Sequence, residues 1–451
     1  MSSLEVPTMP LTTPVVPLQP VAADRRTFPY SALPRTVFLD DEVPMRPAPD
    51  RWITDTTFRD GMQARRAYSP EQILHLYDLL HRLDNDTGTI RACEFFLYSD
   101  QDRAAVELCR ARDYRFPQVT SWIRARAEDL ALVGARGLGE TGILTSVSDH
   151  HIHTKLGLTR AAAMESYLKI VDAALEAGIR PRCHFEDVTR ADIEGFVVPF
   201  ASALVERGRQ AGIPITIRLC DTLGVALPWA AVALPRGVPR LVRALIEQAG
   251  VPSAQLEWHG HNDFFKGHAC AATAWLYGCA AINSTLLGTG ERTGNTPLEA
   301  AVVEHVGLTG EDKLDLKALV EIAAYMRDVC GVPLPANQPL LGEECFTTRA
   351  GVHIDGLLKD PETYLSFNPV AVLGRPIGVV VSDKSGVAGI AWWVNERLGL
   401  KGPDRLAKSY PGVRAMFEAL SARYTAGNAA DPTDSELSAL AQRFLPEHFS
   451  M

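Results

Sequence analysis

Two histidines placed two residues apart are the first side chains in this sequence that could do chemistry. His259 and His261 lie in the segment EWHGHNDF, residues 257–264. A β-strand projects residues i and i+2 to the same face, so both imidazoles are expected to point the same way. On their own they could share one metal ion or be two hydrogen-bonded core histidines, and imidazole chemistry gives these readings roughly even weight.

An oxygen ligand from another part of the chain would favour a metal site over a pair of structural histidines. Asp60, in DTTFRDGMQ (residues 55–63), supplies a carboxylate that is predicted to end the first strand. Two imidazoles and one carboxylate leave coordination positions open for a bidentate ligand such as a 2-oxo acid. These mixed donors suit Mn²⁺, Co²⁺, Zn²⁺ or Mg²⁺. The structural alternative for Asp60 is a turn or helix cap.

Arg59 precedes Asp60 and could polarise a carbonyl oxygen where negative charge develops. The alternative is a surface ion pair. Neighbouring residues of a strand face opposite ways, so Arg59 and Asp60 serve the same site only if the strand has ended by Arg59.

The pattern of apolar residues predicts the strands and helices that must position these side chains. Short apolar or β-branched runs recur about every thirty residues, and helical patterns lie between them. The runs span residues 51–60, 91–99, 117–125, 141–149, 180–188, 214–222, 254–263 and 280–291. Eight such units predict an α/β fold, a TIM (β/α)₈ barrel.

Helix signals support this assignment. In residues 69–83, Ser69 can cap, Pro70 suits the first helical position and Gln72 can complete a capping box. Residues 159–178 repeat apolar side chains at helical spacing and stop at Gly178. Both segments are predicted to be outer helices of the barrel.

A barrel of this type carries its chemistry at the carboxyl ends of its strands. Ionisable side chains accumulate at these predicted strand ends: Asp60, Asp149, Glu186, Asp187, Asp221, His259, His261, Asp263 and Glu291. In a closed barrel of eight strands the first strand lies two strands from the seventh. Asp60 is therefore expected to meet the two histidines on one rim.

Three regions are predicted along the chain: a flexible, Pro-rich arm at residues 1–48, the catalytic barrel at 49–310, and a linker with a mostly helical lid region at 311–451. The arm has no positively charged start and no apolar block, which predicts a cytoplasmic protein. The eight cysteines are scattered without a CxxC pair, so reduced thiols are expected.

The net charge of -9 and the absence of a long Lys/Arg run argue against nucleic acid or an anionic membrane as partner. Small-molecule substrates are expected instead.

Seven motifs in order resemble the DRE-TIM metallolyases, specifically the Claisen-condensing branch that contains homocitrate synthase and 2-isopropylmalate synthase. The motifs are DTTFRDGMQ, SVSDHHIHTKLG, HFEDVTR, LCDTLGV, HGHNDF, GTGERTGNTPLE and AGVHIDG, within about residues 50–400. Further segments, including EFFLYSDQDR and WLYGCAA, look closest to the Re-type citrate synthases and 2-phosphinomethylmalate synthase.

The resemblance implies roles for the matched positions. Asp60, His259 and His261 look like ligands of a divalent metal, Mn²⁺ or Co²⁺ first, and Asn295 matches a position that coordinates or supports it. Arg59, Glu186, His353 and Tyr364 match catalytic residues, the last two from a lid contributed across a homodimer. Gln63 and Thr222 match substrate-binding residues.

Plainer alternatives accompany these roles. Thr222 could cap a helix, Glu186 could pair with Arg190, and a lone His353 or Tyr364 is more often packed or exposed than catalytic. Met62 stands where the family usually has Glu. The chain also ends too early for the leucine-sensing domain of many isopropylmalate synthases.

The resemblance implies an acyltransferase that condenses acetyl-CoA with an anionic 2-oxo acid, phosphinopyruvate or oxaloacetate, and hydrolyses the thioester to release 2-phosphinomethylmalate or citrate and CoA. Alternatives are a homocitrate or 2-isopropylmalate type of synthase using another 2-oxo acid, a metal-dependent acyl-CoA lyase, or a non-catalytic barrel paralogue. Arg124, Arg182 and Arg190 are candidates for binding the second anion of the substrate.

Overall fold

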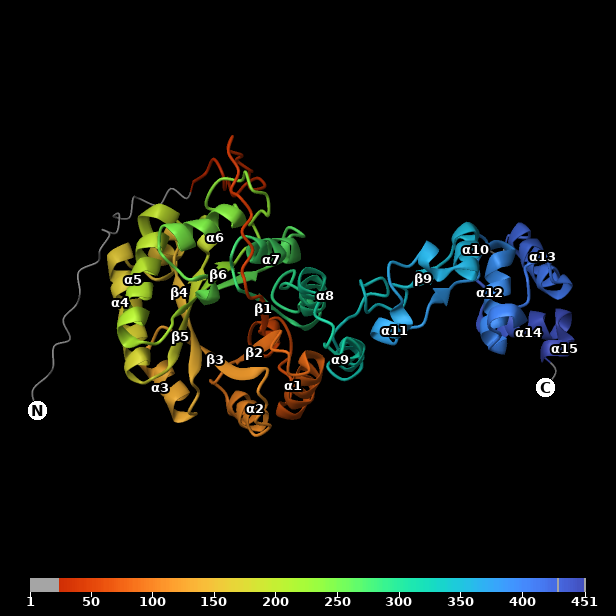
Figure 1. Ribbon diagram of the computed structural model, residues 1–451, viewed down its shortest axis with the longest axis horizontal. Helices are drawn as coiled ribbons and strands as arrows, with labels where there is room; N and C mark the ends of the chain where they lie inside the picture. The colour runs from red at the N-terminus through yellow and green to blue at the C-terminus, as the bar shows by residue number, and fades with distance from the viewer. Residues whose placement is uncertain (1–23, 428–429, 450–451) are drawn as a thin grey trace, which may run out of the picture. The chain divides into compact units, whose positions relative to one another are not determined.

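Eight parallel strands form a closed barrel in the order β1 to β8, each paired with its neighbours and β8 with β1 (Figure 1). The computed structural model describes residues 24–427 and 430–449. The strands are β1 (Trp52–Asp55), β2 (Ile90–Phe95), β3 (Gln118–Arg124), β4 (Glu140–Ser146), β5 (Arg180–Glu186), β6 (Thr216–Asp221), β7 (Leu256–Gly260) and β8 (Ala281–Ser284). Each strand falls inside one of the eight predicted runs, or begins at most one residue before it. The closed order of the eight strands confirms the predicted barrel.

One helix follows each strand and packs outside the barrel (Figure 1). These are α1 (Pro70–Asp84), α2 (Asp100–Arg110), α3 (Ala127–Ala135), α4 (Arg160–Glu176), α5 (Val198–Ala211), α6 (Val238–Glu247), α7 (Gly267–Leu276) and α8 (Leu298–Thr309). The predicted capping box is present: the Ser69 side chain accepts from the Gln72 N–H, and Gln72 reaches back to Ser69. Helix α4 ends just before Gly178, whose φ of 71° suits glycine.

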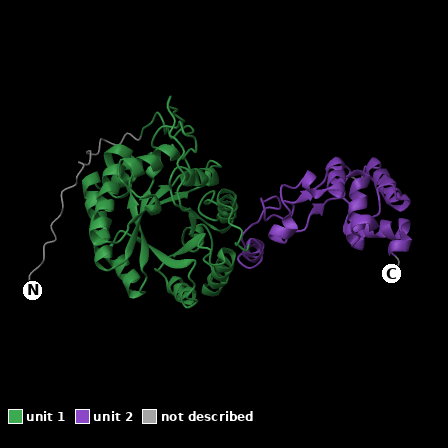
Figure 2. Cartoon of the chain, in the orientation of Figure 1, with its two compact units in different colours: residues 1–315 green, residues 316–451 purple. Residues whose placement is uncertain are grey.

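The chain separates into two compact units, residues 1–315 and 316–451, coloured separately in Figure 2. The second unit is mainly helical, as predicted, with α9 (Lys317–Asp328), α10 (Gly351–Lys359), α11 (Pro369–Leu373), α12 (Gly386–Leu398), α13 (Pro411–Thr425), α14 (Asp434–Phe444) and α15 (Pro446–Phe449). Ile354 and Leu357 of α10 pack with Ala388 and Trp392 of α12 in one of its cores. Two short parallel strands, β9 (Thr347–Thr348) and β10 (Gly378–Val379), were not predicted.

The described part of the N-terminal arm, residues 24–48, is bound to the barrel by hydrogen bonds. The Leu39 N–H donates to the Ala231 carbonyl at 2.8 Å, and the Ala233 N–H donates to the Val37 carbonyl at 2.9 Å. Residues 1–23 of the predicted arm lie outside the described residues. Within the described chain, no helix has both the length and the apolar character of a membrane span. All eight cysteines are free thiols.

A charged layer fills the inside of the barrel where apolar side chains are usual. We call it the ionic layer and define it as Glu94, Arg182, Arg218 and Glu257, all at most 2% exposed. Arg218 Nη1 donates to Glu94 Oε2 at 2.9 Å, and its Nε lies 3.0 Å from Glu257 Oε2. Arg182 Nε lies 3.1 Å from the same Glu257 oxygen. Each buried charge therefore has an opposite partner, as burial requires.

The pKa of Glu94 reflects this pairing. Burial alone would raise the pKa of its carboxyl group, but the charges of Arg218 and Arg59 hold the pKa well below its usual range. Glu94 is therefore ionised and able to hold cationic side chains in fixed positions.

The ionic layer predicts a large stability effect for Arg218→Met. The substitution leaves Glu94 and Glu257 with a buried charge that has lost its main partner, so the free energy of unfolding should fall by about 3–5 kcal/mol. Arg209→Met is the matched control, because Arg209 pairs with Glu206 at 2.6 Å with 70% of its side chain exposed. That variant should change stability by less than about 0.5 kcal/mol. Urea unfolding followed by circular dichroism measures both, and equal shifts would contradict the account.

Candidate metal centre and surrounding site

Strand β1 is shorter than predicted, and this places Arg59 and Asp60 on the same site. The prediction that Asp60 ends the first strand is wrong, because β1 stops at Asp55. The Asp55 carboxylate accepts hydrogen bonds from the Thr57 N–H at 3.0 Å and the Thr57 hydroxyl at 2.5 Å, which turns the chain into a π-helical segment, Thr57–Gly61. Arg59 and Asp60 therefore no longer follow strand alternation.

Three donor atoms from distant parts of the chain converge at the rim. His259 Nε2 and His261 Nε2 are 3.3 Å apart, and Asp60 Oδ2 lies 3.8 Å from the first and 3.9 Å from the second. All three residues are buried. Donors about 2.1 Å from one cation, at tetrahedral or octahedral angles, are separated by about 3.0–3.4 Å, so small side-chain shifts would let all three bind one ion.

The hydrogen bonding of these residues also fits a cation. Asp60 Oδ2 is a buried oxygen without a hydrogen-bond partner among the described residues, and so is the nearby Asn295 Oδ1. Asn295 pairs with His261 through a backbone bridge, and its Nδ2 donates to the Thr289 carbonyl at 2.9 Å. Unpaired buried oxygens are rare in proteins, and a metal ion would satisfy the one on Asp60.

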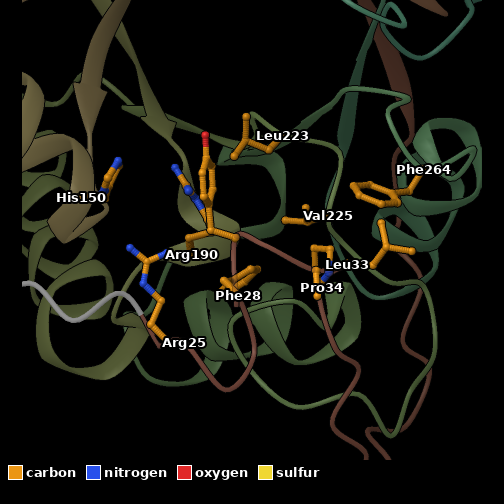
Figure 3. A pocket seen from close by; sticks show the side chains of 11 residues that line it. Arg25, Phe28, Leu33, Pro34, His150, Arg190, Leu223, Val225 and Phe264 are labelled. Atoms are coloured by element: carbon orange, nitrogen blue, oxygen red, sulfur yellow. The ribbon is translucent and has the colours of Figure 1, made fainter.

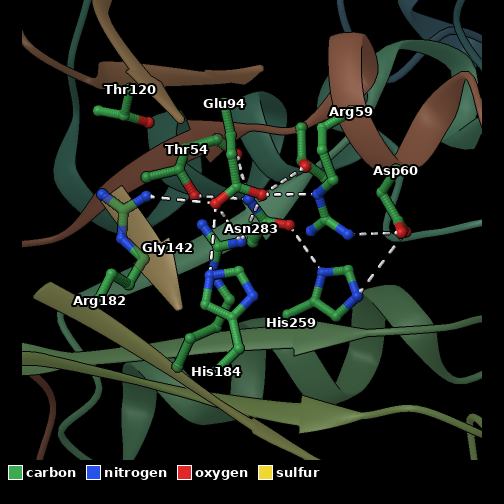
Figure 4. A network of polar contacts seen from close by, with 12 residues as sticks. Thr54, Arg59, Asp60, Glu94, Thr120, Gly142, Arg182, His184, His259 and Asn283 are labelled. Carbon is green, nitrogen blue, oxygen red and sulfur yellow. Dashed lines mark hydrogen bonds and ion pairs between the residues drawn. The ribbon is translucent and has the colours of Figure 1, made fainter. Parts of the chain in front are cut away.

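A hydrogen-bond chain fixes which nitrogen of His259 is free. Glu257 is ionised and accepts from the Thr54 hydroxyl, so the Thr54 oxygen accepts from Asn283 Nδ2 at 2.7 Å. The Asn283 amide is thereby oriented with Oδ1 toward His259 Nδ1, at 2.7 Å. His259 Nδ1 must carry the proton, and its Nε2 presents a lone pair on the side of Asp60 (Figure 4). His261 Nε2 lies 3.3 Å from the same atom.

The pKa shifts agree with a metal-ligand assignment. Burial lowers the pKa of His259 to about 3, more strongly than the charge of Asp60 raises it, so the imidazole is neutral at pH 7. Burial also lowers the pKa of His261. For Asp60 burial acts in the opposite direction, but the charge of Arg59 holds the pKa below its usual range. The result is one carboxylate and two neutral imidazoles, the protonation states that bind a divalent cation.

Arg59 connects the donor cluster to the ionic layer. It is 6% exposed; its Nε donates to Glu94 Oε1 at 2.8 Å and its Nη1 to Asp60 Oδ1 at 2.8 Å (Figure 4). Its guanidinium carbon lies 5.5 Å from the centroid of the Trp122 ring. The two carboxylate bonds use Nε and Nη1 and leave Nη2 out of both ion pairs.

Glu186 lies at the end of β5 and is held by groups that the sequence did not identify. It accepts from Ser146, from His151 Nδ1 at 3.1 Å and from Lys155 Nζ at 2.8 Å. Burial would raise the pKa of its carboxyl group, but His151 and Lys155 lower the pKa to about 2. The ion pair with Arg190 considered as an alternative is absent, because Arg190 pairs with Asp187 at 2.7 Å.

Other predicted residues occupy different surroundings. Thr222, at the end of β6, accepts a hydrogen bond from the Asp187 N–H at 2.8 Å and so lies beside the end of β5. Gln63 is exposed just after the π-helical segment. His353 and Tyr364 belong to the second unit, where their ring centroids are 4.4 Å apart and both side chains are exposed. Their predicted roles stay predictions.

The candidates for an anion-binding arginine already have carboxylate partners. Arg124 pairs with Asp129 at 2.8 Å, and Arg190 with Asp187. Arg182 belongs to the ionic layer inside the barrel, with 2% of its surface exposed.

The sequence did not identify Glu94, which holds Arg59, or the chain of Glu257, Thr54 and Asn283 that orients His259. A signal for the two glutamates was present, because Glu94 and Glu257, like Arg218, are charged residues with an apolar residue on each side within a strand. Charged side chains in buried strands require partners, and several such strands in one barrel imply that the charges meet inside.

The cluster predicts that His261→Ala loses divalent-cation binding without unfolding. Removal of one of three donors should weaken the affinity for Mn²⁺ by more than about 100-fold, because second-layer partners alone are worth about 10–100-fold. His268→Ala is the control, since His268 pairs with Glu304 on the outside of the same region. Electron paramagnetic resonance measures bound Mn²⁺, and circular dichroism measures folding. An unfolded His261→Ala variant, together with a native protein that binds no cation, would make the histidines structural.

The hydrogen-bond chain predicts a distinct effect of Asn283→Leu. Without the Asn283 oxygen, nothing fixes the His259 proton on Nδ1, so the affinity for Mn²⁺ should fall by about 10–100-fold while Asp60, His259 and His261 are all retained. Asn262→Ala is the control, because the side-chain oxygen of Asn262 accepts from the Gly267 N–H at the start of α7 and is not bonded to His259. Isothermal titration calorimetry compares them; an Asn283→Leu variant with native affinity would exclude this orienting role.

Several known proteins are similar to this chain in sequence. At 48% identity, the chain resembles a citrate (Re)-synthase of Syntrophus aciditrophicus over 94% of its own length and 68% of that protein. The identity to a citrate (Re)-synthase of Clostridium kluyveri is 46%, over 93% of each chain. A 2-phosphinomethylmalate synthase of Streptomyces hygroscopicus is 37% identical over 92% of this chain and 94% of that protein.

Among solved structures, a hydroxymethylglutaryl-CoA lyase from Pseudomonas aeruginosa has the same barrel fold. Its TM-score is 0.51 at 20% identity, and the match covers 64% of this chain and 95% of the lyase. The family model described as HMGL-like matches residues 51–326, which include all eight barrel strands and every donor of the metal cluster. The chain belongs to the HMGL-like family.

Proposed function

We propose that this protein is a divalent-metal-dependent acyltransferase that condenses acetyl-CoA with an anionic 2-oxo acid, oxaloacetate first, and releases citrate and CoA. The observation that carries the proposal is the buried cluster of Asp60, His259 and His261 beside the cationic Arg59. The 48% and 46% identities to citrate (Re)-synthases support oxaloacetate over phosphinopyruvate, since the 2-phosphinomethylmalate synthase is 37% identical.

The metal would be held by Asp60, His259 and His261, with Asn295 in support. Mn²⁺ or Co²⁺ is the first choice, and Mg²⁺ or Zn²⁺ also suits one carboxylate and two imidazoles. A bound dication supplies Lewis acidity that polarises the carbonyl of the 2-oxo acid.

Arg59 acts on the oxygen that becomes negative. When the methyl carbon of the acetyl group attacks the carbonyl carbon of the oxo acid, the carbonyl electron pair moves to oxygen. The Arg59 guanidinium, fixed by Glu94 and Asp60, presents Nη2 to that oxygen without having to reorganise. The stabilisation is greatest in the transition state, as catalysis requires.

A base must first remove a proton from the methyl group of the thioester, and His353 is the proposed base, with Tyr364 beside it. Glu186 is ionised at neutral pH and can accept but not donate a proton. Gln63 and Thr222 are the proposed oxo-acid contacts. Water then cleaves the thioester and releases CoA. A homodimer in which the lid region supplies His353 and Tyr364 completes the proposal.

A thiol-release assay tests the proposed reaction. The protein is stripped with chelator and reloaded with Mn²⁺ or Co²⁺, then given acetyl-CoA with oxaloacetate, phosphinopyruvate, 2-oxoglutarate or 2-oxoisovalerate. We expect metal-dependent CoA release with oxaloacetate above the other acids, and a six-carbon tricarboxylate product by mass spectrometry.

Other results would redirect the proposal. Preference for phosphinopyruvate would replace the oxo acid but keep the reaction, whereas preference for 2-oxoglutarate or 2-oxoisovalerate would overturn the substrate class. Cleavage of a 3-hydroxyacyl-CoA without any oxo acid would indicate a lyase. No CoA release under any of these conditions would indicate a non-catalytic paralogue.

A further inference from the structure

A pocket of about 560 Å³ lies on the barrel at the carboxyl ends of β4 to β7 (Figure 3). One wall is the N-terminal arm, with Arg25, Phe28 and Tyr30, and the other walls are loops that follow the strands, with Arg190 and Phe264 among them. Its volume falls in the range of small-molecule binding sites. None of the metal donors lines it, so it is a separate compartment of the rim.

The arm is anchored at this pocket by a buried arginine. Arg236, which is 6% exposed, donates from Nε to the Val225 carbonyl at 2.8 Å and from Nη1 to the Arg35 carbonyl. Its guanidinium carbon also lies 5.9 Å from the centroid of the Phe28 ring. A buried cation therefore fixes the arm to the loop after β6, and Phe28 becomes part of a defined wall.

The pocket adjoins the loops that carry the proposed site. Val225 is three residues beyond Thr222, and Phe264 is three residues beyond His261. These loops touch: a Cβ at Gly224 would lie 2.9 Å from the His261 carbonyl oxygen, and the φ of Gly224 is +62°. The loop that lines the pocket after β6 therefore packs directly against the backbone of a metal donor.

The charge of the pocket is opposite to that of the whole protein. The chain has 54 acidic and 45 basic residues, yet the lining contains Arg25, Arg190 and His150 and no carboxylate. Arg190 is paired with Asp187, but within the described chain no carboxylate pairs with Arg25. In Figure 3 the nitrogen-bearing side chains lie on one side, and Phe264 lies on the other. This arrangement suits a ligand with an anionic end and an uncharged end.

We infer that this pocket binds the CoA part of the acyl donor, with Arg25 contacting its phosphates and Phe28 packing against the nucleotide or the pantetheine arm. The inference rests on the proposed function, which requires a thioester to reach the metal donors. CoA has the required form, because its phosphates lie far from the sulfur and an uncharged arm connects them. The N-terminal arm is then part of the substrate site.

Arg25→Glu tests this inference in the full-length protein. Loss of a charge-assisted contact to phosphate should raise the KM for acetyl-CoA about tenfold, with kcat and the KM for the oxo acid changed by less than about twofold. Arg26→Glu is the matched control: the neighbouring Arg26 is exposed, pairs with Asp24 and does not line the pocket. Phe28→Ala should also raise the KM for acetyl-CoA.

The outcomes separate this inference from the proposed function. An unchanged KM for acetyl-CoA in Arg25→Glu, or an equal rise in Arg26→Glu, would overturn the pocket assignment while turnover remains. If the native protein turns over no oxo acid, calorimetry with 3′-phosphoadenosine 5′-diphosphate, the nucleotide part of CoA, still tests whether the pocket binds CoA. Binding that is lost in Arg25→Glu and retained in Arg26→Glu would support the pocket, and no binding to the native protein would overturn it.

Discussion

Closure of the barrel brings a carboxylate and two imidazoles into one buried cluster, and the candidate chemistry depends on this convergence. Strands β1 and β7 are both paired with β8, so Asp60 and the two histidines reach the same rim although about 200 residues separate them. Burial keeps the imidazoles neutral, and the adjacent Arg59 keeps Asp60 ionised. The fold therefore sets both the positions and the protonation states of the donors.

The ionic layer below the rim explains why these positions are fixed. Glu94 holds Arg59, and Glu257 acts through Thr54 and Asn283 to orient His259. Arg218 contacts both carboxylates and balances their charge. Burying such charges has a large desolvation cost, which an apolar barrel interior would avoid. The barrel is therefore less stable than one with an apolar interior, but its buried ion pairs hold Arg59 and His259 in fixed positions.

Much of the barrel followed from sequence patterning, because each of its eight strands lies in an apolar run. The capping box at Ser69 and the eight apolar runs identified elements and their order. The site was predicted where a period-two pattern placed His259 and His261 on one face. Asp60 was assigned correctly to the rim but for a wrong reason, because the π-helical segment after Asp55, not the strand, positions it.

What the sequence left open depends on contacts between distant residues. No local pattern links Glu94 to Arg218, or Asn283 to Thr54, since these pairs are 124 and 229 residues apart. The pairing of Arg190 with Asp187 instead of Glu186 depends on backbone geometry, as Asp187 has a φ of 64°. The contribution of the N-terminal arm to a pocket was likewise invisible, because its prolines indicated only an extended chain.

Anomalous X-ray diffraction from crystals grown with Mn²⁺ tests the central claim most directly. The account predicts one strong peak about 2.0–2.3 Å from Asp60 Oδ2, His259 Nε2 and His261 Nε2, with His259 Nδ1 still bonded to Asn283. A map with no peak among these three atoms, at a Mn²⁺ concentration that supports turnover, would contradict it.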